Sequence, residues 1–359
     1  MPDHLFVRGG ILRNGISRRG LLGGGAGLIA APFVSRPAFA ADKITVADPG
    51  GVYVIGFTPA FYAPFRKTGV ELVNVSRDAE PTSQVKAQVE AKSYIWDVVS
   101  ITLSSRKLLS DAGLLEPLQL SGADYDELLP LAKQPDWMGT NVYGSVLGFR
   151  TDAMKARPSN WADFYDVAKF PGRRALPKSP IHTLEGALLA DGVDPKQLYP
   201  LDVDRAFKKL DAIKPHIAVW WTSFTQTTQL LQSGEIDFLP SSNARIQAAI
   251  DNGAPVEIIW DGGLYGMEGW AIPKGCPRAE IAKKFIASCA NGEHQALYTK
   301  ALAYGPTNQA AFKFIEPARA KQLPTEPANF SKLIPSNDTW WGANKDKMFE
   351  RFNAWLLRG

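Results

Sequence analysis

Side chains that could carry out catalysis are few and scattered in this chain. After residue 40 the histidines are His182, His216 and His294, and no Gly-x-Ser-x-Gly sequence lies near them. Nucleophilic catalysis needs a nucleophile beside an oriented base, and a metal site needs clustered ligands. Because neither spacing occurs, we expect no catalytic residue, no metal and no cofactor.

Aromatic and polar side chains instead follow the ends of predicted strands. A Gly-rich turn presents Tyr53 after the first strand, and Ser100 and Thr102 follow the third. In a sheet wrapped by helices, solutes bind beyond the carboxyl ends of the strands. The sequence therefore predicts a binding cleft lined by Tyr53, Ser100, Thr102, Trp221, Thr222, Ser223, Ser242, Asn243, Arg245, Tyr265 and Glu268.

Each of these residues also has a purely structural interpretation. Ser and Asn at helix starts are commonly caps, and Arg245 could pair with a surface carboxylate. Trp220 and Trp221 must face opposite sides of their strand, and we favour Trp221 for the cleft. On that interpretation Trp221→Ala abolishes binding and leaves the fold intact. Tyr265 and Glu268 are placed in a Gly-rich loop.

The elements that position these residues alternate along the chain. Short apolar runs predict strands at 44–47, 71–75, 96–101, 145–149, 217–221, 236–239, 256–260 and 269–272. Amphipathic segments predict helices at 56–66, 81–91, 105–111, 161–165 (capped by Ser159), 183–190, 203–213, 225–232, 244–251 and 345–357. This alternation predicts an α/β fold with mostly parallel sheets wrapped by helices. Cys276 and Cys289 flank a predicted helix too long for a disulfide to span.

Residues 1–40 have the features of an export signal. Ser17-Arg18-Arg19 precedes a modestly apolar segment at 21–34, and Ala38 and Ala40 suit a signal peptidase. The Arg pair and the Gly-rich, weakly apolar run favour the twin-arginine pathway over the general secretory route, although both stay open. We expect cleavage near Ala40–Ala41 and a soluble periplasmic protein.

The charge of the chain changes once this leader is removed. The leader holds five arginines and one aspartate, so residues 41–359 carry 35 basic and 35 acidic side chains. A neutral balance gives no support to nucleic-acid binding. About 319 remaining residues predict two domains.

Several segments carry a resemblance to a known family. They lie at 44–53, 60–65, 96–99, 113–118, 159–164, 170–174, 188–193, 234–236 and 304–308. In order and spacing they resemble a periplasmic solute-binding protein of an ABC transporter, of the spermidine/putrescine-binding type. The resemblance implies a type II clamshell of two α/β lobes that closes on a small solute. It also implies a monomer that delivers the solute to a permease and ATPase complex in the inner membrane.

The resemblance also implies how the chain is divided. Lobe 1 would comprise residues 41–149 and a return segment at 262–304, and lobe 2 would comprise residues 150–261. C-terminal helices at 305–359 would pack on lobe 2.

The type of solute is a separate question. Polyamine binders place acidic residues in the loop before the first helix of lobe 2, where this chain has Lys178-Ser179 and His182. Positive charge there would repel a polycation and could pair with a carboxylate. We therefore expect Lys178 and His182 to line the cleft, and an anionic, zwitterionic or neutral solute.

Three alternatives stay open at this point. They are a spermidine/putrescine-binding protein, a receptor-associated sensor with the same cleft, and a hydrolytic or transferase enzyme on the same fold.

Overall fold

The structure is a computed structural model that describes residues 42–77 and 81–358, so the predicted export signal lies outside the described residues. The strands are β1 (Lys43–Asp48), β2 (Glu71–Ser76), β3 (Val98–Thr102), β4 (Lys133–Gln134), β5 (Trp137–Arg150), β6 (Arg174–Pro177), β7 (Ile217–Trp221), β8 (Phe238–Ser242), β9 (Val256–Ala271), β10 (Gly305–Pro306) and β11 (Ile334–Pro335).

The α-helices are α1 (Val52–Phe57), α2 (Ala63–Arg66), α3 (Thr82–Ala91), α4 (Leu103–Asp111), α5 (Ala123–Asp126), α6 (Trp161–Tyr165), α7 (Thr183–Ala190), α8 (Val203–Ile213), α9 (Phe224–Ser233), α10 (Asn243–Asp251), α11 (Ala279–Ser288), α12 (Gly292–Ala301), α13 (Pro317–Ala320), α14 (Pro327–Phe330) and α15 (Asp338–Leu356). A π-helical turn, Thr58–Tyr62, joins α1 to α2. The predicted helix at 56–66 is thus three pieces that begin at Val52.

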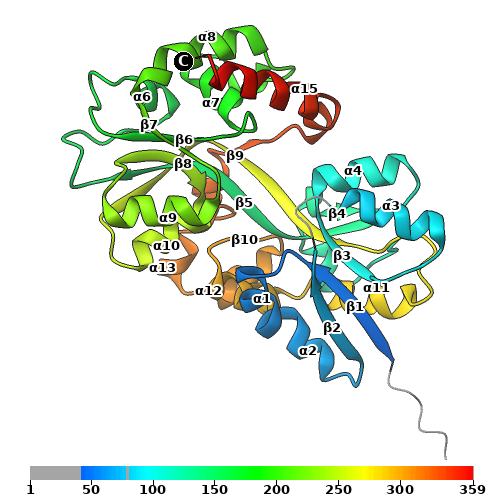
Figure 1. The fold of residues 1–359 in the computed structure, drawn as a ribbon. Helices are drawn as coiled ribbons and strands as arrows, with labels where there is room; N and C mark the ends of the chain where they lie inside the picture. Colours follow the sequence, from blue (N-terminus) through cyan, green and yellow to red (C-terminus); the bar gives the residue numbers. More distant parts are fainter. Residues whose placement is uncertain (1–41, 78–80, 359) are drawn as a thin grey trace, which may run out of the picture. The chain divides into compact units, whose positions relative to one another are not determined.

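One mixed sheet runs through the fold in the order β2-β1-β3-β9-β5-β8-β6-β7. Pairing is parallel among β1, β2 and β3 and among β6, β7 and β8, and antiparallel where β5 and β9 join the two sets. Figure 1 shows β5 and β9 side by side between these sets. The parallel sets therefore belong to two lobes that share two long crossing strands, and we call them lobe 1 (β1–β3) and lobe 2 (β6–β8).

Strand β9 corrects the sequence prediction most clearly. The predicted strands at 256–260 and 269–272, with a Gly-rich loop between them, are one continuous strand of 16 residues. Its glycines allow close contact with β5, since a Cβ on Gly269 would lie 2.0 Å from the Met138 carbonyl oxygen. Tyr143 of β5 lies directly over Gly266 in the same way. These glycines mark close packing between strands, and not a loop.

The structure differs from the sequence prediction at two smaller points as well. Strand β6 was not predicted, because Arg174 and Pro177 flank only two apolar residues. Arg174 is nevertheless buried, and its guanidinium donates to the carbonyl oxygens of Phe164, Phe170 and Gly172. The N-cap of α6 is Asn160, which accepts a hydrogen bond from the Asp163 amide, and not the predicted Ser159.

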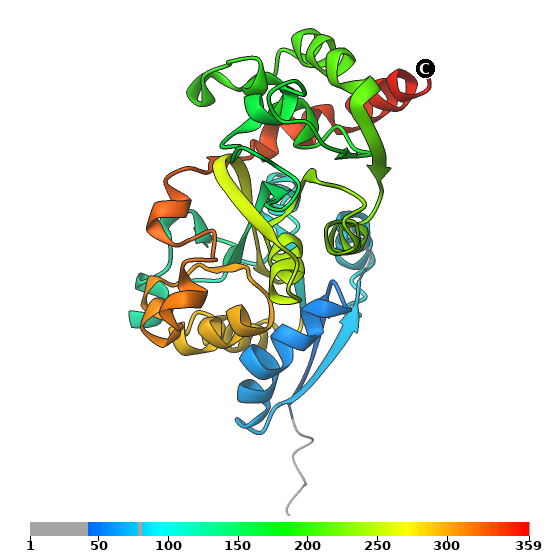
Figure 2. The same cartoon turned by 90° about the vertical axis from the view of Figure 1, so that its left-hand side faces the viewer.

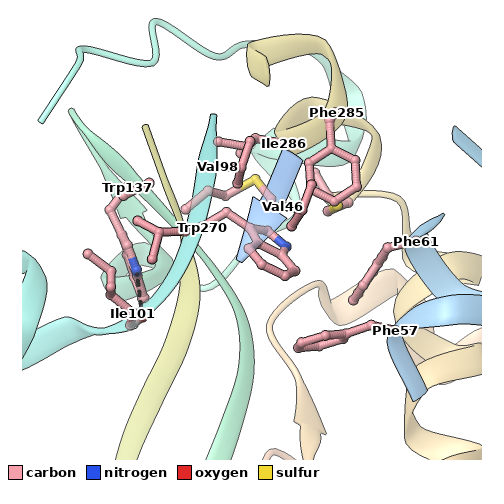
Figure 3. Packing of buried hydrophobic residues seen from close by; sticks show 14 of the residues in the cluster. Val46, Phe57, Phe61, Val98, Ile101, Trp137, Trp270, Phe285 and Ile286 are labelled. Carbon is pink, nitrogen blue, oxygen red and sulfur yellow. Dashed lines mark hydrogen bonds between the residues drawn. The ribbon is translucent and has the colours of Figure 1, made fainter. Parts of the chain in front are cut away.

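Each lobe has its own hydrophobic core. In lobe 1, Trp270 packs among Phe57, Phe61 and Phe285, and the Trp137 indole donates to the Ile101 carbonyl oxygen (Figure 3). In lobe 2, the long helix α15 buries four side chains in the same cluster as helices α7 and α8; these are Trp341, Met348, Phe352 and Trp355. Figure 2 shows this red C-terminal helix beside the green helices of lobe 2. Cys276 and Cys289 are both buried and unpaired.

Candidate functional site

Asp48 fixes the turn that follows β1 at the carboxyl edge of lobe 1. One carboxylate oxygen accepts a hydrogen bond from the Gly50 amide at 2.7 Å, and the other accepts from the Tyr62 hydroxyl at 2.6 Å. Gly50 has a φ of 72° and Gly51 a φ of 55°, which glycine adopts without strain. The turn therefore leads directly into α1 and presents Tyr53 one residue into that helix.

A buried ion pair lies next to this turn. The Arg77 guanidinium donates through Nη2 to Oε1 of Glu268 at 2.6 Å, and the Ser100 hydroxyl donates to the same oxygen at 2.8 Å. The Arg77 Nε donates to the Ser100 carbonyl oxygen at 2.6 Å. The two charged side chains are only 4% and 5% exposed. Burial raises the pKa of Glu268, while Arg77 and Ser100 oppose that rise. The pair joins the ends of β2 and β3 to the crossing strand β9.

Three tyrosine rings meet beside the ion pair. The Tyr53 ring stacks on Tyr304 with centroids 5.9 Å apart, and Tyr143 meets the Tyr304 ring edge-on at 6.5 Å. The Tyr304 hydroxyl lies 3.5 Å from both the Tyr53 hydroxyl and the Ser242 Oγ. Because Tyr53 belongs to lobe 1 and Ser242 precedes α10 in lobe 2, Tyr304 connects polar groups of both lobes.

Burial raises the pKa of Tyr53, and the nearby Tyr304 and Glu268 add to that rise. The Tyr53 hydroxyl therefore stays protonated and can donate a hydrogen bond at neutral pH.

Lobe 2 contributes a polar rim at the ends of β6 and β7. The Lys178 amide donates to the Trp221 carbonyl oxygen at 2.8 Å, which places Lys178 beside the start of α9. Lys178, Thr222 and Ser223 are exposed. Ser223 caps α9 by accepting from the Gln226 amide at 3.4 Å. Exposed hydroxyls, a cation and the positive end of a helix lie together here and suit a carboxylate.

Trp221 lies in the core of lobe 2. Its side chain is buried and packs on Phe224 with ring centroids 5.2 Å apart, while Trp220 packs on Phe352 and Trp355. The Trp221 indole nitrogen is buried without a hydrogen-bond partner. Replacing Trp221 by alanine would therefore also remove core packing, so a loss of binding in that variant would not isolate a contact with solute.

His182 corrects the charge argument made from the sequence. It precedes α7 in the left-handed conformation, with a φ of 63°, and desolvation lowers its pKa to about 4. The imidazole is therefore uncharged at neutral pH and cannot repel a cation. His182 therefore adds no positive charge to this loop at neutral pH.

The remaining predicted site residues have structural contacts. Thr102 caps α4 by accepting from the Ser105 amide at 3.2 Å. Asn243 accepts from the Gly144 amide at 2.9 Å and donates to the Ala303 carbonyl oxygen, so it links β5 to the segment just before Tyr304. The Arg245 backbone carbonyl oxygen accepts from the Thr228 hydroxyl at 3.0 Å, and Arg245 lines a cavity of about 220 Å³ together with Tyr304.

Tyr265 lies in strand β9, as does Glu268, and not in a loop. It packs on Phe330 with ring centroids 5.0 Å apart. Three positions separate it from Glu268, so the two side chains point to opposite faces of the strand.

The structure thus brings together Tyr53, Ser100, Ser242 and Glu268 from the predicted set, and it leaves Tyr265 on the other face. Arg77, Tyr143 and Tyr304 belong to the same site and were not predicted as site residues. Arg77 follows β2 directly, so the rule that solutes bind beyond strand ends could have found it. Tyr304 lies within the segment that carries the resemblance, but its contact with Tyr53 depends on the folded chain.

A separate cavity of about 780 Å³ lies between α4 and the segment at 333–339. It is lined by Arg106, Lys107, Lys196 and Tyr199 among others, and by none of the residues that surround Glu268. Among residues 42–77 and 81–358, no group of three metal-ligating side chains occurs. In the same residues, no helix is long and apolar enough to cross a membrane.

Comparison with known proteins places this arrangement in context. The sequence pattern of the bacterial extracellular solute-binding protein family matches residues 60–326. A gamma-aminobutyric acid-binding protein of Pseudomonas aeruginosa is 33% identical over 323 residues, which are 88% of this chain and 92% of that protein.

Two crystal structures show the same fold. An ABC transporter substrate-binding protein from Bradyrhizobium japonicum USDA 110 is 38% identical and superposes with a TM-score of 0.79, covering 88% of this chain and 99% of that one. The periplasmic binding protein AgtB of A. tumefaciens R10, in complex with agropinic acid, is 34% identical with a TM-score of 0.72 over 88% and 99% of the two chains.

Two α/β lobes that share crossing strands, with polar and aromatic groups at their meeting edges, define a two-lobed solute-binding protein. The chain belongs to the bacterial extracellular solute-binding protein family. The expected family is confirmed at this level, but its polyamine-type subdivision is not, because the matched relative is named for gamma-aminobutyric acid.

Proposed function

We propose that this protein is the periplasmic component of an ABC importer and binds a small solute bearing a carboxylate, either zwitterionic or anionic. The observation that carries the proposal is the Tyr53, Tyr304 and Ser242 contact, which brings polar groups of both lobes together beside the Arg77–Glu268 pair. A solute held at this edge would touch both lobes, and hinge closure around a solute is a known motion of periplasmic binding proteins.

The charges at the site favour an acid over a polycation. Glu268 is neutralised by Arg77, and Asp48 is buried with both oxygens hydrogen-bonded. Lys178 is exposed beside Thr222 and Ser223. A carboxylate can pair with Lys178 and these hydroxyls, whereas a dication meets no free carboxylate among these groups. The names of the ligands of two relatives, gamma-aminobutyric acid and agropinic acid, support an acidic solute.

The remaining parts of the proposal concern the route and the partners. The leader at 1–40 would direct twin-arginine export, with cleavage near Ala40–Ala41, and the mature protein would act as a monomer. It would deliver its solute to a permease and ATPase complex in the inner membrane. Lobe 1 would be 41–149 with 262–304, and lobe 2 would be 150–261. The expectation that all of 305–359 packs on lobe 2 needs correction: α15 buries its side chains in lobe 2, whereas Ala311, Ile315 and Leu323 lie in the hydrophobic core of lobe 1.

Native mass spectrometry of the protein purified from its periplasm tests the solute class. We expect a 1:1 complex with a small carboxylic acid that is released with unchanged mass. Recovery of spermidine or putrescine would contradict the charge argument, and recovery of a chemically converted product would favour an enzyme.

A matched pair of lysine variants tests the site. With the identified acid, Lys178→Met should weaken binding roughly tenfold through loss of a charge-assisted contact. Lys196→Met removes another exposed lysine of lobe 2 and should leave the affinity unchanged. Equal affinities in both variants, measured by calorimetry, would place the carboxylate elsewhere.

A further inference from the structure

Glu268 is a carboxylate in a setting that otherwise suits an organic cation. The Tyr53 ring is close enough for Glu268 to raise the pKa of its hydroxyl, and Tyr304 stacks on Tyr53. Tyr143 shares the Glu268 face of the crossing strands, because it pairs with Gly266, two residues before Glu268. Carboxylates beside aromatic faces are the groups that bind ammonium ions.

The Arg77 guanidinium already forms an ion pair with this carboxylate. Its Nη2 lies 2.6 Å from Oε1 of Glu268, and the Ser100 hydroxyl reaches the same oxygen. The guanidinium is held in place by a further hydrogen bond from Nε to the Ser100 carbonyl oxygen, and its backbone amide donates to the Asp48 carbonyl oxygen at 2.8 Å. A solute ammonium would have to displace a cation that is bound within the protein itself.

The other acid at this edge does not offer an alternative. Asp48 is fully buried, and its two oxygens accept from the Gly50 amide and the Tyr62 hydroxyl. Of these two carboxylates, only Glu268 could therefore pair with a cationic solute. Arg77 already neutralises it.

We propose that Arg77 is a specificity-determining residue that excludes diamines by occupying the cation position at Glu268. The inference rests on the proposed function, because it concerns which solutes the same site accepts. It predicts that removal of the guanidinium converts the site into one that binds a diamine, since an ammonium group can then take the place of Arg77.

The test is a titration of Arg77→Met with putrescine, followed by calorimetry and by thermal melting. We expect putrescine to bind Arg77→Met at least about tenfold more tightly than it binds the unmodified protein, and to raise its melting temperature. The double variant Arg77→Met/Glu268→Gln also lacks the guanidinium but has no carboxylate to bind an ammonium group, and it should show no gain. Arg150→Met, which removes a guanidinium paired with Asp152 at the far end of β5, should show none either.

Each result decides the proposal. If Arg77→Met unfolds alone but folds when putrescine is added, the diamine has replaced the guanidinium, which supports it. A folded Arg77→Met that gains no affinity for putrescine overturns it. The proposal is also overturned if Arg77→Met stays unfolded with putrescine while the double variant folds. An equal gain in affinity for putrescine in the double variant overturns it as well. None of these results depends on the natural solute, so the proposed function is tested separately.

Discussion

Glu185 shows how a single buried carboxyl can make stability depend on pH. One of its oxygens accepts from the Tyr199 hydroxyl at 2.7 Å and the Trp341 indole at 2.6 Å, while the other has no partner. Desolvation raises its pKa to about 7. The folded protein therefore holds this proton at pH values where the unfolded chain, with an ordinary carboxyl, has lost it.

Glu185→Gln should remove this dependence. The contribution of Glu185 is fully present below about pH 4.5 and is lost as the pH rises through 7, a difference on the order of 3 kcal/mol at pH 8. Gln keeps an oxygen for Tyr199 and Trp341, so the variant should be the more stable protein at pH 8 and similar at pH 4.5.

Denaturant titrations of both proteins at each pH measure this effect. Comparing them at equal pH cancels the opposite contribution of His182, whose lowered pKa makes stability fall as the pH drops below about 6.5. A variant that is less stable at pH 8 would show that the Glu185 carboxylate is needed in its charged form.

At the scale of elements, the crossing strands depend on close approach between β5 and β9. Gly269→Ala would bring a Cβ within 2.0 Å of the Met138 carbonyl oxygen, so we expect a loss of about 3 kcal/mol or more in the free energy of unfolding. Gly342 in α15 has only an ordinary contact, 3.4 Å from Leu108.

Gly342→Ala is the matched control for this prediction. It should stabilise the protein by about 0.5–1 kcal/mol, because alanine favours the helix. Chemical unfolding of the two variants gives both values. A Gly269→Ala protein as stable as the unmodified one would mean that β5 and β9 are farther apart than described.

These elements also show what the sequence could and could not reveal. The strand at 217–221 was predicted because its continuous apolar run, Ile-Ala-Val-Trp-Trp, is a local signal. Strand β9 was predicted as two pieces because its glycines resemble a loop, and their partner β5 lies more than a hundred residues away. Arg77 directly follows a predicted strand, so its position could have been noticed in the sequence, but its pairing with Glu268 is visible only in the folded chain.

The site residues also include some that the sequence could predict and some that it could not. Ser100 and Glu268 were predicted from strand ends or loops, and they do meet. Trp221 was favoured by the alternation of its strand, which distinguishes two faces but not which of them is covered by α9. His182 was counted as a cation because its type is visible in the sequence, whereas its desolvation is not.

At the scale of the whole molecule, the proposed export route makes a prediction of its own. Replacing Arg18 and Arg19 together by lysine should leave the unprocessed chain in the cytoplasm, because the twin-arginine pathway reads that pair. Replacing Arg8 and Arg13 by lysine keeps the same net charge in the leader and should not alter export. Fractionation with N-terminal sequencing measures both. Normal export of the Arg18/Arg19 variant, with a start at Ala41, would point to the general secretory route.

Isothermal titration calorimetry of residues 41–359 measures whether the protein prefers a small carboxylic acid to a diamine. Gamma-aminobutyric acid and putrescine are matched probes, since each has a four-carbon chain and an amine, and only the first has a carboxylate. We expect one saturable site for an acid of this class, and no binding of putrescine at the same concentrations. Tight binding of putrescine with none of the acid would contradict this expectation.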